Sequence, residues 1–323
     1  VEFYSGIGGL AVAAKQAGVE VKLSFDIHPL ANKTHELNFP SVSTSPTTIC
    51  KLSAKSLSTL FSKYFQGTPA FWLLSPPCQP FSRRGLQKDL EDQRNESFLH
   101  LIKLLSTIEE ELLPQYVLVE NVACFEQSQT REHLTAALKN RNYHIQEFLL
   151  SPTQFGIPNQ RLRYFCLAKK HPLEFYSTDY DDKINTTIAN AQASHSSVCD
   201  PICEYLELET PVQDMLQSYG IKDKTLERSG KLFDIKIPQS RTTNCFTKSY
   251  GRFVEGSGSV LETSSVEVQA DLQYSDEEIV KELKKRKLRY FSPREMLNLH
   301  GFPKDFVFPN EITTQQAYKL IGN

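Results

Sequence analysis

A glycine-rich stretch near the start of the chain restricts the fold more than any other segment. Glu2-Phe3-Tyr4 has the character of a strand, Ser5-Gly6-Ile7-Gly8-Gly9 of a tight turn, and residues 10–17 of a helix. A second strand, residues 21–25, ends at Asp26. Open α/β sheets begin in this order, with a turn that lets a ligand approach the backbone and a carboxylate that can hold ribose hydroxyls. The turn lacks the G-x-G-x-x-G spacing, so a tight turn without a ligand is an equal alternative.

A single cysteine lies in a proline-rich loop after the apolar run Phe71-Trp72-Leu73-Leu74. The loop reads Ser75-Pro76-Pro77-Cys78-Gln79-Pro80-Phe81. Each proline holds φ at about −65° and removes a backbone donor, so the loop is stiff. A thiol presented at a strand end, with Arg83 and Arg84 just downstream, suits a thiolate nucleophile. A lone cysteine is more often a small core residue, so this interpretation depends on the other motifs.

Two further polar groups follow buried strands. Residues 116–119 are apolar and end in Glu120-Asn121-Val122, where open α/β sheets place their chemistry. An end-of-strand charge that reaches solvent is the alternative. Arg161 lies in the loop between two expected strands, residues 143–150 and 163–168, and Arg163 begins the second. Alternation puts the two arginines on one face, where they suit a phosphate, a carboxylate or a base edge. A pair of surface arginines is the other interpretation.

Composition favours a soluble globular enzyme in a reducing compartment. The chain has 323 residues and seven cysteines without a framework, and no apolar run is long enough to cross a membrane. The net charge is −2, so any contact with nucleic acid depends on local clusters such as residues 281–289. His195, Cys199 and Cys203 recur every four residues, but a fourth ligand is missing and we expect no metal site.

The motifs in this order resemble those of the cytosine-C5 methyltransferases that use S-adenosylmethionine, and the resemblance covers nearly the whole chain. Within that superfamily the chain is similar to the tRNA-aspartate methyltransferases, the eukaryotic DNA-methyltransferase-2 homologues. The segments that carry this narrower resemblance are Ser151-Pro152-Thr153, Asn244-Cys245-Phe246-Thr247, Tyr250-Gly251, Glu255-Gly256-Ser257-Gly258-Ser259 and Leu288-Arg289-Tyr290-Phe291-Ser292-Pro293-Arg294-Glu295.

The resemblance implies a Rossmann-like methyltransferase fold, a doubly wound and mostly parallel sheet with a smaller target-recognition domain. We expect the first part of the catalytic domain at 1–168, the recognition domain with a mobile insertion at 169–288, and a return to the catalytic domain at 289–323. Cys124 departs from the family, which has glycine there. The sequence begins at Val1 without Met, already in an expected strand, so we expect a few residues before it. The family pattern continues past Asn323, so we expect part of one cofactor wall after that residue.

The implied activity is methyl transfer from S-adenosylmethionine to C5 of cytosine 38 in the anticodon loop of tRNA(Asp), which leaves S-adenosylhomocysteine. In this scheme Cys78 adds to C6, Glu120 holds N3 and the exocyclic amine, Arg163 holds O2, and Arg161 orients Glu120 or a phosphate. The resemblance implies cofactor contacts at Tyr4, Gly6, Ile7, Gly8, Gly9, Leu10, Asp26, Ile27, His28, Ile49, Pro76 and Asn323. It implies tRNA contacts at Arg83, Arg84, Lys248 and Arg289.

Two alternatives stay open. The same catalytic residues would serve a methyltransferase that acts on duplex DNA, and a catalytically idle RNA-binding homologue would keep the fold. The small recognition region and Cys245-Phe246-Thr247 favour tRNA, and the intact catalytic set favours an enzyme because binding alone needs no thiol. We expect a monomer that binds tRNA, with weak DNA binding as a secondary property and no membrane association. We expect it in the cytoplasm, with the nucleus as a second compartment.

Overall fold

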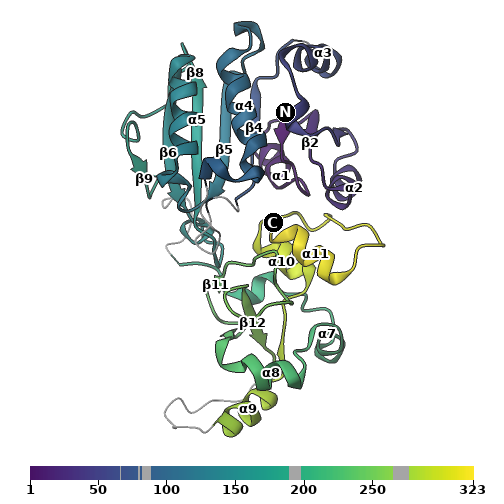
Figure 1. Cartoon of the computed structure of the whole chain (residues 1–323). Coiled ribbons are helices and arrows are strands. Elements are labelled where there is room, and N and C mark those ends of the chain that lie inside the picture. The colour runs from purple at the N-terminus through teal and green to yellow at the C-terminus, as the bar shows by residue number, and fades with distance from the viewer. Residues whose placement is uncertain (66, 79–80, 82–88, 189–197, 265–275) are drawn as a thin grey trace. The chain divides into compact units, whose positions relative to one another are not determined.

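The computed structural model describes residues 1–65, 67–78, 81, 89–188, 198–264 and 276–323 (Figure 1). These residues divide into two compact units. The first unit contains Val1–Leu150 and Leu162–Ala189, and the second contains Ser151–Arg161 and Asn190–Asn323. Among the described residues, no helix has the length and apolar character that crossing a bilayer requires.

The first unit is built on one mixed sheet whose strands lie in the order β3-β2-β1-β4-β5-β8-β6-β9. Its first five strands are parallel neighbours, whereas β8 pairs antiparallel with both β5 and β6. The strands are β1 (Glu2–Phe3), β2 (Leu23–Phe25), β3 (Ser43–Ser45), β4 (Phe71–Leu74), β5 (Tyr116–Val122), β6 (Tyr143–Leu150), β8 (Arg163–Lys170) and β9 (Ile184–Asn185).

The chain order along this sheet reverses between β1 and β4. From β1 the chain moves outward to β2 and β3, then returns to the other side of β1 to form β4 and β5. At such a switch point the loops after adjacent strands diverge, and open α/β sheets bind ligands outside the carboxyl ends of the strands there. The loops after β1 and β4 both begin at this switch point.

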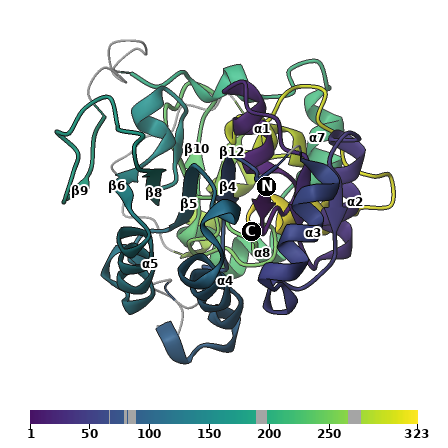
Figure 2. The ribbon, with the colours of Figure 1, turned by 90° about the horizontal axis from the view of Figure 1, so that it is seen from above.

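Helices cover both faces of the sheet, as Figure 2 shows for α4 and α5 on one side of β4 and β5 and α1 on the other. Apolar side chains of α3, α4 and α5 pack with Trp72, Val117 and Val119 in the main core. Ala11 and Ala14 of α1 pack with Leu73 in a second cluster. The helices are α1 (Gly9–Gln16), α2 (Pro29–Asn38), α3 (Ala54–Tyr64), α4 (Glu96–Thr107) and α5 (Gln129–Asn140).

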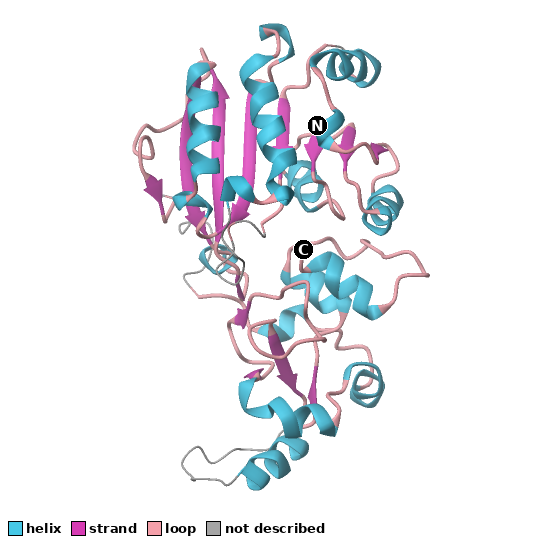
Figure 3. Ribbon diagram, in the orientation of Figure 1, coloured by secondary structure: helices cyan, strands magenta, loops and turns pink. Residues whose placement is uncertain are grey.

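The second unit contains short strands and helices (Figure 3). The strands β10, β12 and β13 form one sheet, and β11 pairs in parallel with β7. The strands are β7 (Asn159–Gln160), β10 (Asp234–Lys236), β11 (Thr243–Asn244), β12 (Ser259–Glu262) and β13 (Leu288–Arg289). The helices are α7 (Val212–Tyr219), α8 (Asp223–Ser229), α9 (Asp276–Lys285), α10 (Pro293–Leu299) and α11 (Thr314–Ile321).

An aromatic cluster forms much of the core of the second unit. The Phe246 ring lies edge-on to those of Tyr250 and Phe291, with centroids 5.0 and 5.3 Å away. The Tyr250 hydroxyl donates to the Ser259 carbonyl at 2.6 Å and accepts from the Phe291 amide at 2.9 Å. The Tyr318 hydroxyl donates to the Phe291 carbonyl, which anchors α11 to the same cluster.

Single turns of 3-10 helix connect several of the elements. They are η1 (Ile49–Lys51), η2 (Asp89–Glu91), η3 (Gln93–Asn95), η4 (Glu110–Leu112), η5 (Phe125–Gln127), η6 (Pro152–Phe155), η7 (Ile202–Tyr205) and η8 (Gly230–Leu232).

The compact units do not coincide with the domain boundaries that we expected at 168 and 288. Packing groups residues 289–323 with the second unit, together with residues 151–161. The assignment of residues 289–323 to the catalytic domain therefore stays a prediction.

Candidate active site

The glycine turn after β1 is open at one end and closed at the other. Gly6 and Gly8 have φ of +52° and +94°, in the left-handed region that side chains disfavour. A Cβ at Gly6 would meet no heavy atom of the described residues within 4 Å. A Cβ at Gly8 would overlap the ring of Phe39 and lie 3.1 Å from Cδ2 of His35. The backbone of the turn is therefore accessible at Gly6 and packed against α2 at Gly8.

Asp26 connects the end of β2 to this turn. Its Oδ2 accepts from the Gly6 amide and its Oδ1 from the His28 amide, both at 2.8 Å. The next side chain, Ile27, is 70% exposed, and His28 caps α2 by accepting from the Ala31 amide at 3.3 Å. A carboxylate and a solvent-exposed aliphatic side chain thus follow β2 directly, beside the open end of the turn.

Tyr4 and Ile49, two other predicted cofactor residues, are largely covered by neighbouring side chains of the protein. The Tyr4 hydroxyl donates to Ser97 Oγ at 3.2 Å, and burial raises the pKa of this phenol well above its ordinary value. Ile49 is buried in the main core. Any contact of these two residues with a ligand is therefore limited to the part of each side chain that the core leaves uncovered.

The loop that carries Cys78 is fixed to neighbouring strands on both sides. Ser75 Oγ donates to the Tyr4 carbonyl at 3.0 Å, and Asn121 Nδ2 donates to the Pro76 carbonyl at 3.5 Å. After the cysteine, the Phe81 amide donates to the Cys78 carbonyl at 3.1 Å, and the buried Phe81 ring packs against Phe125. Cys78 itself is a free thiol that remains partly exposed.

Glu120 lies at the carboxyl end of the next parallel strand. In the β4–β5 register Leu74 is opposite Val119, so the Cys78 loop and Glu120 leave the sheet at the same edge. Glu120 Oε1 lies 3.2 Å from Nε of Arg163, the first residue of β8, and its side chain is 24% exposed. This ion pair orients the carboxylate and leaves part of it accessible to a ligand.

Arg161 does not share a strand face with Arg163, contrary to our expectation. The reason is that β7 ends at Gln160 and β8 begins at Arg163, so alternation does not run between the two arginines. Arg161 belongs to the second unit, where its Nη1 lies 3.6 Å from Cys245 Sγ and 3.4 Å from the Phe246 carbonyl. The contact joins two motifs that the sequence had singled out separately.

The predicted tRNA contacts have different outcomes. Lys248 is exposed. Arg83 and Arg84 lie outside the described residues. His195, which the sequence places near Cys199 and Cys203, lies outside them as well. Arg289 is 4% exposed and makes a double hydrogen bond to Glu295, with Nη1–Oε2 at 2.7 Å and Nη2–Oε1 at 2.8 Å. We therefore correct the expectation for Arg289, because a buried guanidinium paired in this way is not presented to a ligand.

Arg94 is not among the predicted site residues, and its electrostatic interactions include a minor one with Cys78. Its Nε donates to Asp92 Oδ1 at 2.8 Å. This hydrogen bond is the main cause that raises the pKa of Arg94, and the Coulomb interaction with Cys78 adds to it. The available sequence signal was an Asp-x-Arg run soon after the cysteine loop.

Cys124, in the turn after β5, has a left-handed backbone conformation of the kind that glycine adopts most easily. This cysteine has φ of +84°, and its amide donates to Glu126 Oε2 at 2.7 Å. The departure from the family's glycine therefore leaves a left-handed backbone in place.

Comparisons with known proteins agree with this geometry. The whole chain, residues 1–323, matches the family described as C-5 cytosine-specific DNA methylase. It is 39% identical to a DNA (cytosine-5)-methyltransferase of Dictyostelium discoideum, over 100% of this chain and 89% of that protein. It is 36% identical to the human tRNA (cytosine(38)-C(5))-methyltransferase, over 100% of this chain and 94% of that protein.

Solved structures give the same result for the fold. A mutant of the Spodoptera frugiperda DNMT2 superposes with a TM-score of 0.82 at 33% identity, covering 100% of this chain and 94% of that chain. The S. pombe Dnmt2 methyltransferase superposes with a TM-score of 0.80 at 31% identity, covering 99% and 92%. These likenesses confirm the predicted Rossmann-like methyltransferase fold. The chain belongs to the C-5 cytosine-specific methyltransferase family.

Proposed function

We propose that this protein methylates C5 of cytosine 38 in tRNA, with tRNA(Asp) as its substrate. The observation that carries the proposal is the arrangement of Cys78 and the Glu120–Arg163 pair at the ends of adjacent strands. This arrangement lies in a chain 36% identical over its full length to a protein named tRNA (cytosine(38)-C(5))-methyltransferase.

Enzymes of this family use S-adenosylmethionine, whose sulfonium supplies an activated methyl group. The residues around the glycine turn fit this cofactor. Each Asp26 oxygen accepts one backbone hydrogen bond and has a further lone pair for a ribose hydroxyl. The exposed Ile27 offers an apolar surface for an adenine ring. We assign the methionine part to the turn and its flanks, Tyr4, Gly6, Ile7, Gly8, Gly9 and Leu10, and the adenine to Ile27 and Ile49. His28, Pro76 and Asn323 are the further candidate contacts.

The residues of the chain perform the pyrimidine chemistry. The Cys78 thiolate bonds to C6 of cytosine, and the electron pair of the C5–C6 double bond becomes available at C5 for the methyl group. Glu120 hydrogen-bonds N3 and the exocyclic amine so that negative charge does not accumulate on the ring. Loss of the C5 proton to a base then restores the double bond and expels the thiolate. Arg163 holds O2 and keeps Glu120 in place, and Arg161 is a candidate contact for a phosphate of the substrate.

The target base has to leave its stack to reach the thiol. This costs less in an RNA loop than in a duplex, because loop bases are already partly unstacked. An anticodon loop is therefore a suitable substrate, and the exposed Lys248 is a candidate contact for its phosphates.

DNA is the second candidate substrate. The specific observation in its favour is the 39% identity to the Dictyostelium discoideum protein, which is named a DNA (cytosine-5)-methyltransferase. The catalytic residues would be the same for both substrates, so the activity has to be compared directly.

The test measures transfer of a labelled methyl group to a tRNA(Asp) transcript, to the same transcript with uracil at position 38, and to a DNA duplex. Cys78→Ala is the inactive variant, and Cys203→Ala is the control because Cys203 is another free, partly buried thiol. We expect transfer to the cytosine-38 transcript by the parent and by Cys203→Ala, and no transfer by Cys78→Ala. Equal activity of Cys78→Ala would overturn the mechanism, and transfer to the duplex alone would favour DNA.

The physiological setting is part of the proposal. All seven cysteines lie within the described residues, and none takes part in a disulfide bond. This fits a reducing compartment, so we propose that the enzyme acts in the cytoplasm, with the nucleus as a second compartment. We also propose that it is a monomer.

A further inference from the structure

We propose that the buried pair Glu2–His35 is a positioning device for the glycine turn and sets the affinity for the cofactor. The pair is not part of the scheme above, and it touches no reacting atom. The inference rests on the proposed function, because it assigns the turn to S-adenosylmethionine.

One carboxylate holds together the three elements that surround the turn. Glu2 is the first residue of β1 and is 0% exposed. Its Oε1 accepts from the Ala11 amide in the first turn of α1 at 3.2 Å. Its Oε2 lies 3.2 Å from His35 Nε2 in α2. The turn leaves β1 and enters α1, so Glu2 ties both ends of the turn to α2.

The imidazole of His35 forms part of the wall against which the turn packs. His35 is 0% exposed and its ring lies 4.8 Å from that of Phe39. Both rings face Gly8, where a Cβ would overlap Phe39 and lie 3.1 Å from His35 Cδ2. The two rings therefore fill the space in which a side chain at Gly8 would lie, beside a backbone that has φ of +94°.

The pair also determines how the ring is held. Within the described residues, His35 Nδ1 has no hydrogen-bond partner, so the bond from Nε2 to Glu2 is the hydrogen bond that holds the ring. The bond requires a proton on Nε2, because a carboxylate oxygen of Glu2 can only accept. Replacing His35 by an apolar ring would leave Oε2 of Glu2 without its partner in a buried position.

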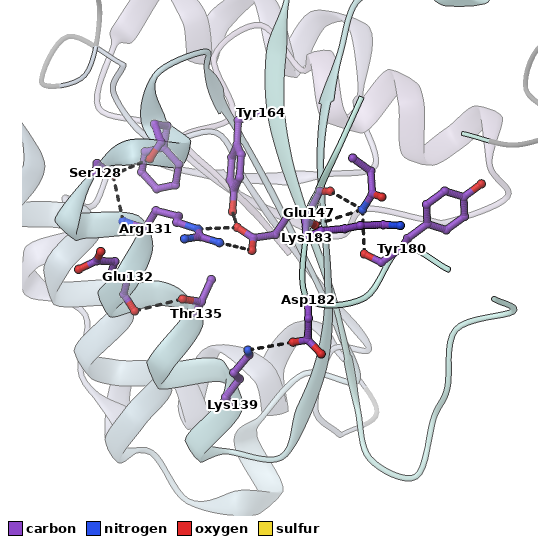
Figure 4. Close-up of polar contacts among 12 residues, drawn as sticks. Ser128, Arg131, Glu132, Thr135, Lys139, Glu147, Tyr164, Tyr180, Asp182 and Lys183 are labelled. Atoms are coloured by element: carbon purple, nitrogen blue, oxygen red, sulfur yellow. Dashed lines mark hydrogen bonds and ion pairs between the residues drawn. The ribbon is translucent and has the colours of Figure 1, made fainter. Parts of the chain in front are cut away.

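A second buried carboxylate of the same unit provides a matched control. Glu147 of β6 accepts from Arg131 of α5 at 2.7 and 2.5 Å and from the Tyr164 hydroxyl at 2.5 Å (Figure 4). It is buried and paired, as Glu2 is. However, it joins β6, β8 and α5, and three strands separate β6 from β1, where the glycine turn begins. A general loss of stability should follow from disturbing either pair, whereas a loss of cofactor affinity should follow only from disturbing Glu2–His35.

The experiment measures binding of S-adenosylhomocysteine by calorimetry, the thermal midpoint, and kcat at saturating cofactor for four variants of the full chain. In His35→Phe we expect Kd to rise by about tenfold or more, as for a lost hydrogen bond to a charged group, with kcat and the KM for tRNA changed less than about twofold. His35→Gln keeps a donor for Glu2 and should restore most of the affinity. Glu147→Gln should lower the thermal midpoint and leave Kd unchanged.

Glu2→Gln keeps the volume and an acceptor for Ala11, so it tests the same pair if His35→Phe does not fold. We expect it to weaken binding by a smaller factor than His35→Phe. Unchanged Kd in both His35→Phe and Glu2→Gln would overturn the proposal, as would an equal rise in Kd for Glu147→Gln. Failure of the unmutated protein to bind would instead overturn the proposed function, and this inference with it.

Discussion

The carboxylate of Glu120 illustrates how a single residue acquires a role from its neighbours. It lies at the end of β5, 3.2 Å from Arg163, and the Asn121 side chain next to it holds the carbonyl of Pro76 in the cysteine loop. Its strand position brings it to the edge of the sheet, and Arg163 then fixes its direction. A positioned group of this kind is suited to stabilise charge on a bound base.

We expect Glu120→Gln to lower kcat by roughly 10²–10⁴-fold, the usual contribution of a positioned acid–base group. The amide keeps the size of the side chain, but it weakens the contact with Arg163 and cannot serve as an acid or a base. Single-turnover methyl transfer to tRNA measures this effect. Glu132→Gln, an exposed residue of α5, is the control. A loss of less than about fivefold would contradict the role assigned to Glu120.

At the scale of elements, the start of α5 depends on a residue far away in the chain. Ser128 caps the helix by accepting from the Arg131 amide at 3.0 Å. Asp89 adds hydrogen bonds from the amides of Gln129 at 2.6 Å and Thr130 at 3.3 Å. Asp89 has φ of +45°, so this contact is made from a backbone conformation that aspartate tolerates better than most residues.

Asp89→Ala should lower the free energy of unfolding by about 1–2 kcal/mol, because it removes a helix-capping carboxylate and places alanine at positive φ. Asp89→Gly removes the same carboxylate but suits the backbone, so it should cost less than alanine. Urea denaturation of the two variants and the parent measures the difference. Stability equal to the parent in both variants would show that Asp89 does not anchor α5.

A second element-scale prediction concerns the basic residues of the second unit. Arg289→Ala should lower the free energy of unfolding of the protein by about 3–5 kcal/mol, because Glu295 is left as a buried, uncompensated carboxylate.

Lys248→Ala should change the free energy of unfolding by less than about 0.5 kcal/mol, because Lys248 is exposed. Lys248→Ala should instead weaken tRNA binding and reduce its dependence on salt. Unfolding curves and salt-dependent binding separate the two, and unchanged stability of Arg289→Ala would contradict the structural role.

At the scale of the whole molecule, buried ionisable groups couple stability to alkaline pH. Burial is the main cause that raises the pKa of Cys166 from 9.0 to about 12 and the pKa of Tyr143 and Tyr164 above their ordinary values. These groups stay neutral in the folded protein and lose their protons in the unfolded chain. The unfolded state therefore binds fewer protons above about pH 9, and stability falls as the pH rises.

We expect the contribution of the buried Cys166 thiol to the free energy of unfolding to be complete below pH 9.0. It should be lost progressively as the pH rises to about 12, because over this range the thiol is neutral only in the folded protein. Each such group contributes a slope of about 1.4 kcal/mol per pH unit in that range. Denaturant unfolding at several alkaline pH values measures the slope. Cys166→Ala should make the slope shallower, and an unchanged slope would rule out the thiol as a contributor.

The sequence by itself determined the residues whose role follows from local pattern. The glycine turn, the acid after β2, the thiol after β4 and the carboxylate after β5 could all be predicted, because strand periodicity and loop composition specify where each strand ends. Parallel strands then bring their carboxyl ends to one edge of the sheet. The residue types at the site could therefore be predicted from the sequence, although their distances and contacts could not.

Tertiary structure decided which partner each side chain meets. Arg289 resembled a surface cation in the sequence but is buried against Glu295. Arg161 and Arg163 looked like a pair but lie in different units. Glu2 and His35, 33 positions apart, gave no local signal at all. The physical reason is that hydrogen bonds and burial depend on long-range packing, while a short segment records only its own backbone preferences and residue types.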